Sequence, residues 1–222
     1  MTEKNKHTPP CVPRHIIWDW NGTLSDDAQA AVNAVNHLLA ERALPTIDLA
    51  RHREKFDFPV RDYYTALGFR LETEDWDALA RRFNDAFHAD PSARLFRGTV
   101  QTLTRLAAAG IAMSVLSACN ETALTAALDR CGIREFFVAV SGLRHNSADS
   151  KLALAERHIA ALALPPETIY IIGDTTHDAE VAEKHNCKCL LLSTGYQSRE
   201  RLIGVGVPVL DCVDDVPKYF GL

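Results

Sequence analysis

The sequence lacks any hydrophobic run long enough to cross a membrane, and its polar, proline-rich first residues lack the apolar stretch of a secretory signal. It also lacks a basic excess, because its formal net charge is −5, which disfavours nucleic acid as a partner. Its six cysteines lack zinc-finger spacing, so we expect reduced thiols rather than a disulfide framework. These absences predict a cytoplasmic protein without membrane or nucleic-acid partners.

Short apolar runs rich in isoleucine and valine alternate with helical patterns along the chain. They lie at residues 15–20, 111–118, 135–142, 168–174, 187–193 and 207–212. Apolar runs separated by helices indicate a parallel sheet that is covered on both faces. The predicted fold class is therefore α/β, with a doubly wound, Rossmann-like, mostly parallel sheet. Cys187 and Cys189 fit the period of a buried strand, which we favour over a soft-metal site.

Far more chain lies between the first and second runs than one crossover needs. Residues 25–95 show several helical patterns and no convincing strand, which predicts an inserted all-helical cap domain. The remaining chain is expected to form an α/β core from residues 13–24 and 96–222. Residues 1–12 are expected to form a flexible tail.

Chemically useful side chains follow the ends of the predicted strands. In open α/β sheets, ligands bind beyond the carboxyl ends of the strands. The side chains expected there are Asp19, Ser117, Lys151, Asp174 and Asp178. Carboxylate oxygens suit Mg²⁺, and an ammonium group suits a phosphate. The sequence therefore predicts a site for Mg²⁺ and a phosphate group at this edge of the sheet.

This set of residues resembles the motifs of the haloacid dehalogenase superfamily, whose members are mostly phosphatases. "DWNGTL" from residue 19 resembles the first motif, Ser117 the second, Lys151 the third, and "GDTTHD" from residue 173 the fourth. The order of the four motifs also matches. A helical insertion after the first motif is similar to the cap of phosphoglycolate phosphatase and its relatives.

The resemblance implies how a nucleophile and a metal ion are arranged. Asp19 is expected to attack phosphorus and form an aspartyl phosphate. Mg²⁺ is expected to be held by Asp19, Asp174 and the backbone carbonyl of Asn21. Asp178 is expected to support the metal directly or through water.

The resemblance also implies which residues bind the phosphoryl group. Ser117, with Ala118 beside it, is expected to bind the phosphoryl oxygens. Lys151 is expected to balance charge on the nucleophile and on the transferring group. Gly22 and Thr23 are expected to let the backbone approach and to supply donors.

Each of these residues also has a purely structural explanation when it is considered singly. An aspartate can start a helix, and most lysines are solvated. We assign such a helix-start role to Asp26 and Asp27, where negative charge favours the helix dipole. The joint placement of the motif residues favours the functional interpretation for the others.

Asn21 departs from the family pattern, which commonly has a second aspartate there as general acid and base. An amide cannot give up or accept a proton near neutral pH, so turnover is expected to be slower. Three functions remain open at this point: a slow phosphatase, a phosphotransferase with a lasting aspartyl phosphate, and a phospholigand-binding protein with a quiescent site. We favour the phosphatase.

The predicted cap is expected to select the substrate. Phe56, Phe58 and Arg61 lie in a predicted joint between two helices, where they are candidates to contact the substrate away from phosphorus. The alternative is that the two rings pack between cap helices and that Arg61 is solvated. A cap that closes over the site favours a small phosphorylated metabolite. We expect a monomer or a homodimer.

Overall fold

A computed structural model describes residues 12–143 and 151–222. Apart from Val12, the tail expected at residues 1–12 lies outside the described residues. Within the described ranges, no helix combines the length and the apolar composition that a membrane crossing requires.

A parallel six-stranded sheet forms the core, in the order β5-β4-β1-β6-β7-β8. Its strands are β1 (His15–Trp18), β4 (Ala112–Asn120), β5 (Ala139–Leu143), β6 (Ile169–Gly173), β7 (Lys188–Leu192) and β8 (Val209–Leu210). After β1, the chain forms β4 and β5 on one side of β1, and then forms β6, β7 and β8 on the other side. The order therefore reverses beside β1, which is where ligands bind in such sheets. The predicted doubly wound α/β fold is confirmed.

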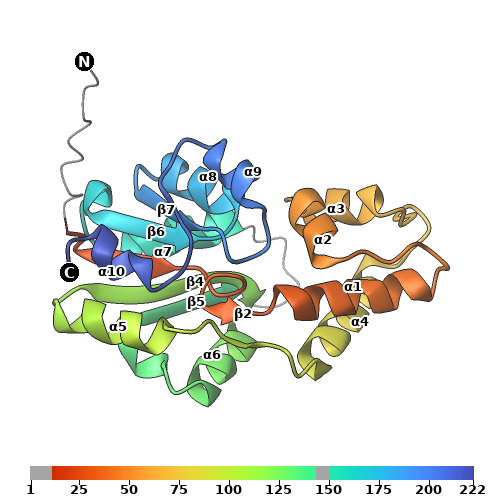
Figure 1. Cartoon of the computed structure of the whole chain (residues 1–222), viewed down its shortest axis with the longest axis horizontal. Helices are drawn as coiled ribbons and strands as arrows, with labels where there is room; N and C mark the ends of the chain where they lie inside the picture. The colour runs from red at the N-terminus through yellow and green to blue at the C-terminus, as the bar shows by residue number, and fades with distance from the viewer. Residues whose placement is uncertain (1–11, 144–150) are drawn as a thin grey trace.

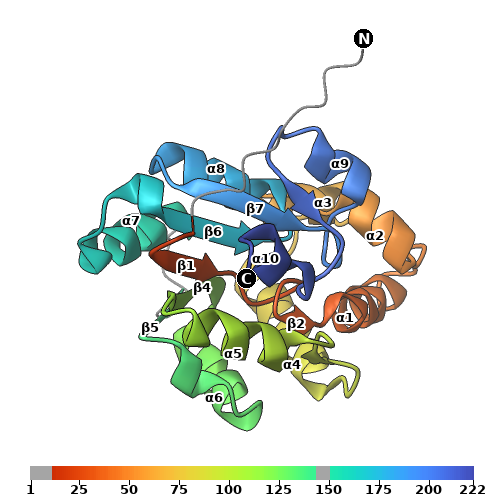
Figure 2. The ribbon, with the colours of Figure 1, turned by 60° about the vertical axis from the view of Figure 1, so that its left-hand side comes forward.

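Helices cover both faces of this sheet (Figures 1 and 2). One face carries α5 (Thr99–Ala108), α6 (Glu121–Arg130) and α10 (Asp215–Tyr219), and the other carries α7 (Lys151–Leu162), α8 (Thr176–Lys184) and α9 (Arg199–Ile203). β1 alternates between the two cores, since Ile16 and Trp18 pack on the first face and Ile17 on the second. Burial on both faces explains why the strand is apolar at every one of these positions.

A helical insertion separates β1 from β4. It consists of α1 (Ala28–Ala40), α2 (Leu49–Lys55), α3 (Val60–Ala66) and α4 (Trp76–Ala89). Figure 1 shows these helices beside the carboxyl ends of the strands. The expectation of no strand in residues 25–95 was wrong. β2 (Ser25–Asp26) pairs antiparallel with β3 (Arg94–Leu95), so a short two-stranded ribbon joins the insertion to the core.

The loop at residues 194–198 also joins the insertion to the core. Arg53 of α2 donates to the Thr194 carbonyl at 2.7 Å and to the Gly195 carbonyl at 2.8 Å. The Ser198 amide donates to the Arg53 carbonyl at 3.1 Å. The insertion is therefore held to the core by hydrogen bonds in addition to its two connecting strands.

Five cysteines lie in the described part of the chain, and all five are free thiols. Cys189 is buried in β7, and Cys187 directly precedes this strand. The strand interpretation of this pair therefore agrees with the structure.

Two buried histidines share one serine inside the core. His15 Nε2 and His158 Nε2 each lie 2.7 Å from Ser114 Oγ. Burial lowers the pKa of both histidines to about 4, and their proximity adds to the shift at His15. Unfolded histidines bind a proton at about pH 6.5, so between about pH 6.5 and pH 4 the unfolded chain binds more protons. These histidines therefore contribute stability at neutral pH that is lost as the pH falls.

We expect the melting temperature to drop by roughly 5–10 °C between pH 7 and pH 5. Thermal melts of His158→Gln should show a smaller drop, because one neutral buried imidazole has been removed. His37→Gln is the matched control, since the His37 side chain is 64% exposed. An equal drop in the His158 and His37 variants would show that the buried histidines do not cause it.

Candidate active site

Asp19 directly follows β1, at the carboxyl end of this strand in the middle of the sheet. β4 and β6 flank β1, so residues that follow these three strands meet at one edge. The Asp19 amide donates to the Ile172 carbonyl of β6 at 2.8 Å, which extends the strand pairing by one residue. Asp19 is only 8% exposed. Its carboxylate is thus fixed at the sheet edge with little access to water.

Lys151 lies between two carboxylates at the start of α7. Its Nζ is 2.5 Å from Asp19 Oδ1 and 2.7 Å from Asp178 Oδ1. Burial lowers the pKa of Lys151, but the two carboxylates raise it more, so the ammonium stays charged. Burial raises the pKa of Asp19 to about 7, and Lys151 opposes this rise. The ammonium thus favours the ionised form of Asp19, which a nucleophile needs.

Asp178 lies behind Lys151, where it is 1% exposed. Its Oδ2 accepts hydrogen bonds from the Thr175 amide at 3.0 Å and the Thr175 hydroxyl at 2.7 Å, while Oδ1 accepts from Lys151. Burial raises the pKa of Asp178, but Lys151 lowers it more, and the net value lies below the ordinary one. In this arrangement Asp178 orients the Lys151 ammonium toward Asp19.

Asp174 follows β6 and is fully buried. Its Oδ1 accepts from the Thr23 hydroxyl at 2.8 Å, and its Oδ2 accepts from the Tyr196 amide at 2.7 Å. Gly22 has φ +74° and approaches so closely that a Cβ there would lie 2.3 Å from Asp174 Oδ2. Gly22 and Thr23 therefore pack against a carboxylate, as the tight turn of the first motif requires.

The donor set around Asp174 fits a hard divalent cation. Burial raises the pKa of Asp174 well above its ordinary value, and the nearby Asp19 and Asp178 raise it further. Lys151 offsets the charge of Asp19 and Asp178, but no cationic side chain of residues 12–143 or 151–222 pairs with Asp174. The same ranges contain no preformed cluster of three His, Cys, Asp or Glu ligands. Two carboxylates and backbone oxygens are the ligands that Mg²⁺ accepts.

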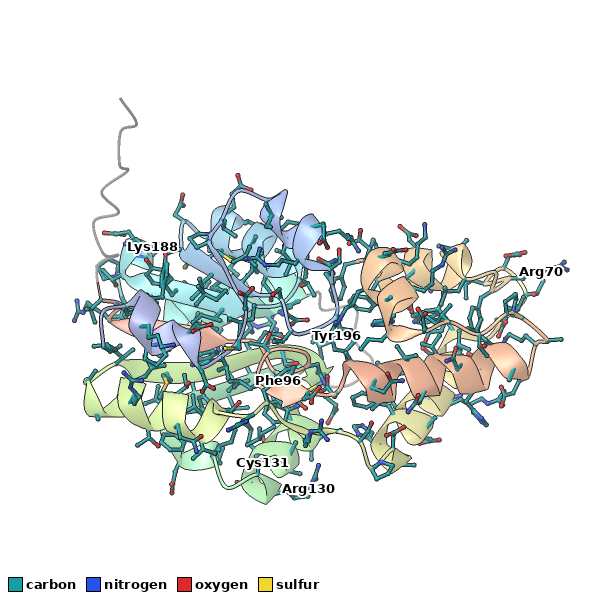
Figure 3. The ribbon with its side chains drawn as sticks, in the orientation of Figure 1. Arg70, Phe96, Arg130, Cys131, Lys188 and Tyr196 are labelled. Carbon is teal, nitrogen blue, oxygen red and sulfur yellow. The ribbon has the colours of Figure 1, made fainter. Side chains whose placement is uncertain are left out.

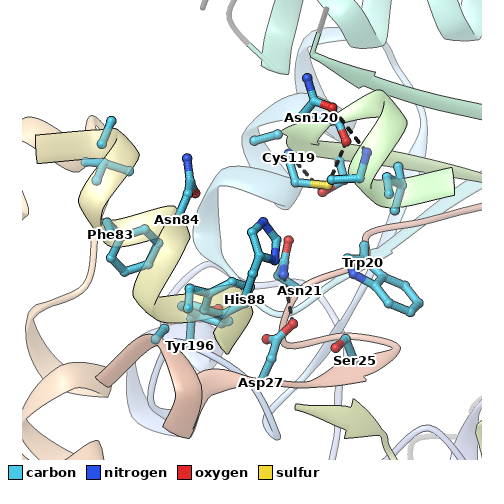
Figure 4. Close-up of a pocket in the computed structure, with 18 of the residues that line it drawn as sticks. Trp20, Asn21, Ser25, Asp27, Phe83, Asn84, His88, Cys119, Asn120 and Tyr196 are labelled. Atoms are coloured by element: carbon cyan, nitrogen blue, oxygen red, sulfur yellow. Dashed lines mark hydrogen bonds between the residues drawn. The ribbon is translucent and has the colours of Figure 1, made fainter. Parts of the chain in front are cut away.

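Asn21 is hydrogen-bonded to a buried carboxylate. Its Nδ2 donates to Asp27 Oδ2 at 2.8 Å, and the Gly22 amide donates to Asp27 Oδ1 at 3.0 Å. Since the amide nitrogen is turned toward Asp27, the carbonyl oxygen of Asn21 points the other way, into the cavity (Figure 4). Asn21 therefore offers the substrate an acceptor where the family pattern has an acid.

Asp27 has a different role from the helix start that we expected. It precedes α1 but makes no side-chain capping bond, and it is 1% exposed. Burial raises its pKa to about 6, while hydrogen bonds from Ser25, Asn21, Tyr196 and Gly22 oppose the rise. The sequence did not predict this role, because an aspartate before a helix is also typical of a helix start. The amide at position 21, which departs from the family pattern, was the signal that could have indicated a carboxylate partner.

One cavity of about 970 Å³ lies between the insertion and the sheet edge. The predicted residues that line it are Asp19, Asn21, Ser117, Ala118, Lys151 and Asp174, together with Phe56, Phe58 and Arg61. Gly22, Thr23 and Asp178 lie behind this lining, where they contact Asp174 or Lys151. The structure thus brings all of the predicted residues to one place.

The predicted cap residues make contacts of their own inside this cavity. Phe58 packs on Phe56 with ring centroids 5.4 Å apart and on His177 of the core at 4.8 Å. The Arg61 guanidinium lies 4.7 Å from the centroid of the Trp76 ring. Arg61 is therefore exposed to solvent, as the alternative expected, and also lies against an aromatic face.

Tyr196 is a site residue that the sequence did not single out. Besides its amide bond to Asp174, it lines the cavity, and its side chain is hydrogen-bonded to Asp27. Figure 3 places it between the sheet and the insertion. It follows β7, so continuing the search past the carboxyl end of that strand would have found it.

Comparisons with known proteins agree with this architecture. The family model described as haloacid dehalogenase-like hydrolase matches residues 16–192. A phosphoglycolate phosphatase of Caulobacter vibrioides is 32% identical, over 91% of this chain and 89% of that protein. The tyrosine-protein kinase PtkA of Mycobacterium tuberculosis is 29% identical over 83% of this chain, which spans only 63% of the kinase.

Solved structures share the fold. A haloacid dehalogenase-like family protein, SP0104 from Streptococcus pneumoniae, has a TM-score of 0.81 at 19% identity, over 94% of this chain and 99% of that one. The structure of M. tuberculosis PtkA has a TM-score of 0.78 at 24% identity, over 95% and 99% of the two chains. The match over most of the chain and the identity with a full-length relative confirm the predicted family, and this chain belongs to the haloacid dehalogenase-like hydrolases.

Proposed function

We propose that this haloacid dehalogenase-like phosphatase hydrolyses small phosphate monoesters with Mg²⁺ through an aspartyl phosphate on Asp19. The observation that carries the proposal is the arrangement of Asp19, Lys151 and Asp174 in the lining of one cavity between the insertion and the sheet edge. A buried carboxylate held by an ammonium group is poised as a nucleophile. The phosphoglycolate phosphatases among the relatives of this chain support the same class of reaction.

The side chains of the site have complementary roles in this proposal. Asp19 attacks phosphorus while Lys151, oriented by Asp178, balances the charge on the phosphoryl oxygens. Ser117, 2% exposed at the end of β4, donates its hydroxyl to a phosphoryl oxygen. When Asp19, Asp174 and the backbone carbonyl of Asn21 bind it, Mg²⁺ supplies positive charge that offsets the phosphate and the carboxylates.

The hydrolysis is proposed to be slow for lack of a proton donor. Asn21 can accept a hydrogen bond from water but cannot take up its proton. Loss of general acid and base assistance costs on the order of 10²- to 10⁴-fold in rate. A cavity covered by the insertion favours small substrates, which reach Asp19 without displacing helices.

We expect a panel of phosphorylated metabolites to be hydrolysed with Mg²⁺ and to lose nearly all turnover in EDTA. The physical reason is that Mg²⁺ would supply the positive charge that offsets the phosphate dianion and the carboxylates of the site. Released phosphate is the measurement, and added excess Mg²⁺ should restore the rate. Full turnover in EDTA, after dialysis against the chelator, would contradict the proposal.

A second candidate is a phosphotransferase, favoured by Asn21 and by the similarity to the kinase PtkA. Without a base, water attacks the aspartyl phosphate slowly, so an alcohol acceptor can compete for it. The same panel distinguishes the two functions when glycerol or a tyrosine-containing peptide is added. A phosphatase releases inorganic phosphate under all conditions, whereas a transferase forms the new ester in preference to phosphate.

A further inference from the structure

Four phenylalanine rings of the insertion line the cavity that also contains Asp19. On α4, Phe83 and Phe87 stack with ring centroids 5.8 Å apart and an interplanar angle of 17°. Phe56 and Phe58, which lie between α2 and α3, form an edge contact at 5.4 Å. All four rings are half-buried and line the same cavity as Asp19. Each of them therefore has ring surface available to a bound molecule.

These rings come from the insertion, whereas the phosphate-binding groups come from the core. Figure 4 shows Phe83 and Asn84 on α4, with Tyr196 between this helix and the loop that carries Asn21. A molecule whose phosphate lies at Asp19 therefore extends its other end toward α4.

Two of the arginines that line this cavity are already engaged. Arg61 lies over the Trp76 ring, and Arg94 pairs with Asp26 at 3.2 Å. Arg130 in the last turn of α6 and His88 in the last turn of α4 also line the cavity. An uncharged ring needs none of these groups, because it needs only apolar surface.

The size of the cavity points in the same direction. A volume of about 970 Å³ belongs to the range that holds ligands with several rings or long side chains. A two-carbon alcohol would fill only a small part of this volume.

Asn21 adds an independent chemical argument. Its amide nitrogen is bonded to Asp27, so it presents a carbonyl oxygen to the cavity and has no proton to give to a leaving group. An alkoxide leaves poorly without a proton, whereas a phenolate leaves without help. The site is therefore suited to esters whose alcohol is acidic.

Building on the proposed function, we propose that the substrate is a monophosphate ester of an aromatic alcohol, with its ring against Phe83 and Phe87. Asp19 forms a bond to phosphorus as the bond from phosphorus to the aryl oxygen breaks. The aryloxide leaves with the electron pair and takes its proton from water. A second water molecule then attacks phosphorus, the bond to Asp19 breaks, and phosphate and a proton are released.

The test compares 1-naphthyl phosphate with acetyl phosphate, which also has a good leaving group but carries no ring. We expect Phe83→Ala and Phe87→Ala each to lower the ratio of kcat/KM for naphthyl over acetyl phosphate by about tenfold. Phe136→Ala is the matched control, because Phe136 is half-buried and packs on the core outside the cavity. Melting curves check folding, and Phe83→Leu provides a conservative variant that should restore part of the ratio.

An unchanged ratio in the folded variants at positions 83 and 87 would overturn the proposal. So would a wild-type preference for 2-phosphoglycolate over 1-naphthyl phosphate. Failure of the proposed function looks different, because acetyl phosphate would then not be hydrolysed, or would be hydrolysed equally without the Asp19 carboxylate. Free phosphotyrosine and a phosphotyrosine peptide form the last comparison. Hydrolysis of either supports the aromatic class, and the better of the two tells whether the ring belongs to a small molecule or to a protein chain.

Discussion

Replacing Asp19 by asparagine is expected to lower phosphate-monoester turnover by on the order of 10⁴-fold or more, because an amide cannot form the aspartyl phosphate. The carboxylate at this position is also the partner of Lys151, at 2.5 Å. Steady-state release of phosphate from an aryl phosphate monoester is the measurement. Trapping of phosphate on the wild-type protein, followed by peptide mapping, should locate the label on Asp19.

Asp26→Asn is the matched control for this variant. It makes the same chemical change in the same segment, but Asp26 pairs with Arg94 on the short ribbon and does not line the cavity. We expect wild-type turnover from it. Magnesium affinity is measured in both variants, so that loss of the metal is recognised. Substantial turnover in Asp19→Asn with the metal still bound would show that another group attacks phosphorus.

Restoring a carboxylate at position 21 is expected to raise turnover of alkyl phosphates, provided that Asp27 is changed with it. Asn21 Nδ2 lies 2.8 Å from Asp27 Oδ2, so Asn21→Asp alone creates two adjacent carboxyl groups that compete for one proton. The exchange Asn21→Asp with Asp27→Asn keeps one amide and one carboxylate in contact. We expect about 10²-fold faster hydrolysis of alkyl phosphates and little change for aryl phosphates.

The single variants separate the two effects. Asp27→Asn alone removes the buried carboxylate without adding an acid, so the alkyl-to-aryl ratio should not rise. Asn21→Asp alone should gain less than the exchange. Magnesium affinity is followed in parallel, because a new charge beside Asp19 can disturb the metal site. If the exchanged protein binds Mg²⁺ normally and the alkyl-to-aryl ratio stays at the wild-type value, then Asn21 does not mark a missing general acid.

The positions of the motif residues are predictable because each follows a strand that is buried on both faces. Such strands are continuous apolar runs, as in Ile16 to Trp18, so the residue that ends the run also marks the sheet edge. The short ribbon of β2 and β3 escaped prediction, since strands of two residues have no visible alternation. Their pairing depends on contacts between residues about 70 apart in the chain.

The hydrogen-bond partners of Asn21 and Asp174 could not be predicted from the sequence, for another reason. Asp27 reaches Asn21 because the turn after Trp20 brings the chain back, with the Leu24 and Ser25 amides both donating to the Trp20 carbonyl. Asp174 accepts from the backbone amide of Tyr196, which any residue other than proline would supply at that position. A hydrogen bond made by the backbone leaves no pattern in the residue types.

The loop at residues 194–198 contacts both the insertion and the proposed metal-binding carboxylate. Its backbone carbonyls hold Arg53 of the insertion, and its Tyr196 amide holds Asp174 in the core. If the insertion moves away from the core, it must either break the hydrogen bonds of Arg53 or move the loop at residues 194–198, which binds Asp174. The position of the insertion and the placement of the Asp174 carboxylate are therefore linked through one short loop.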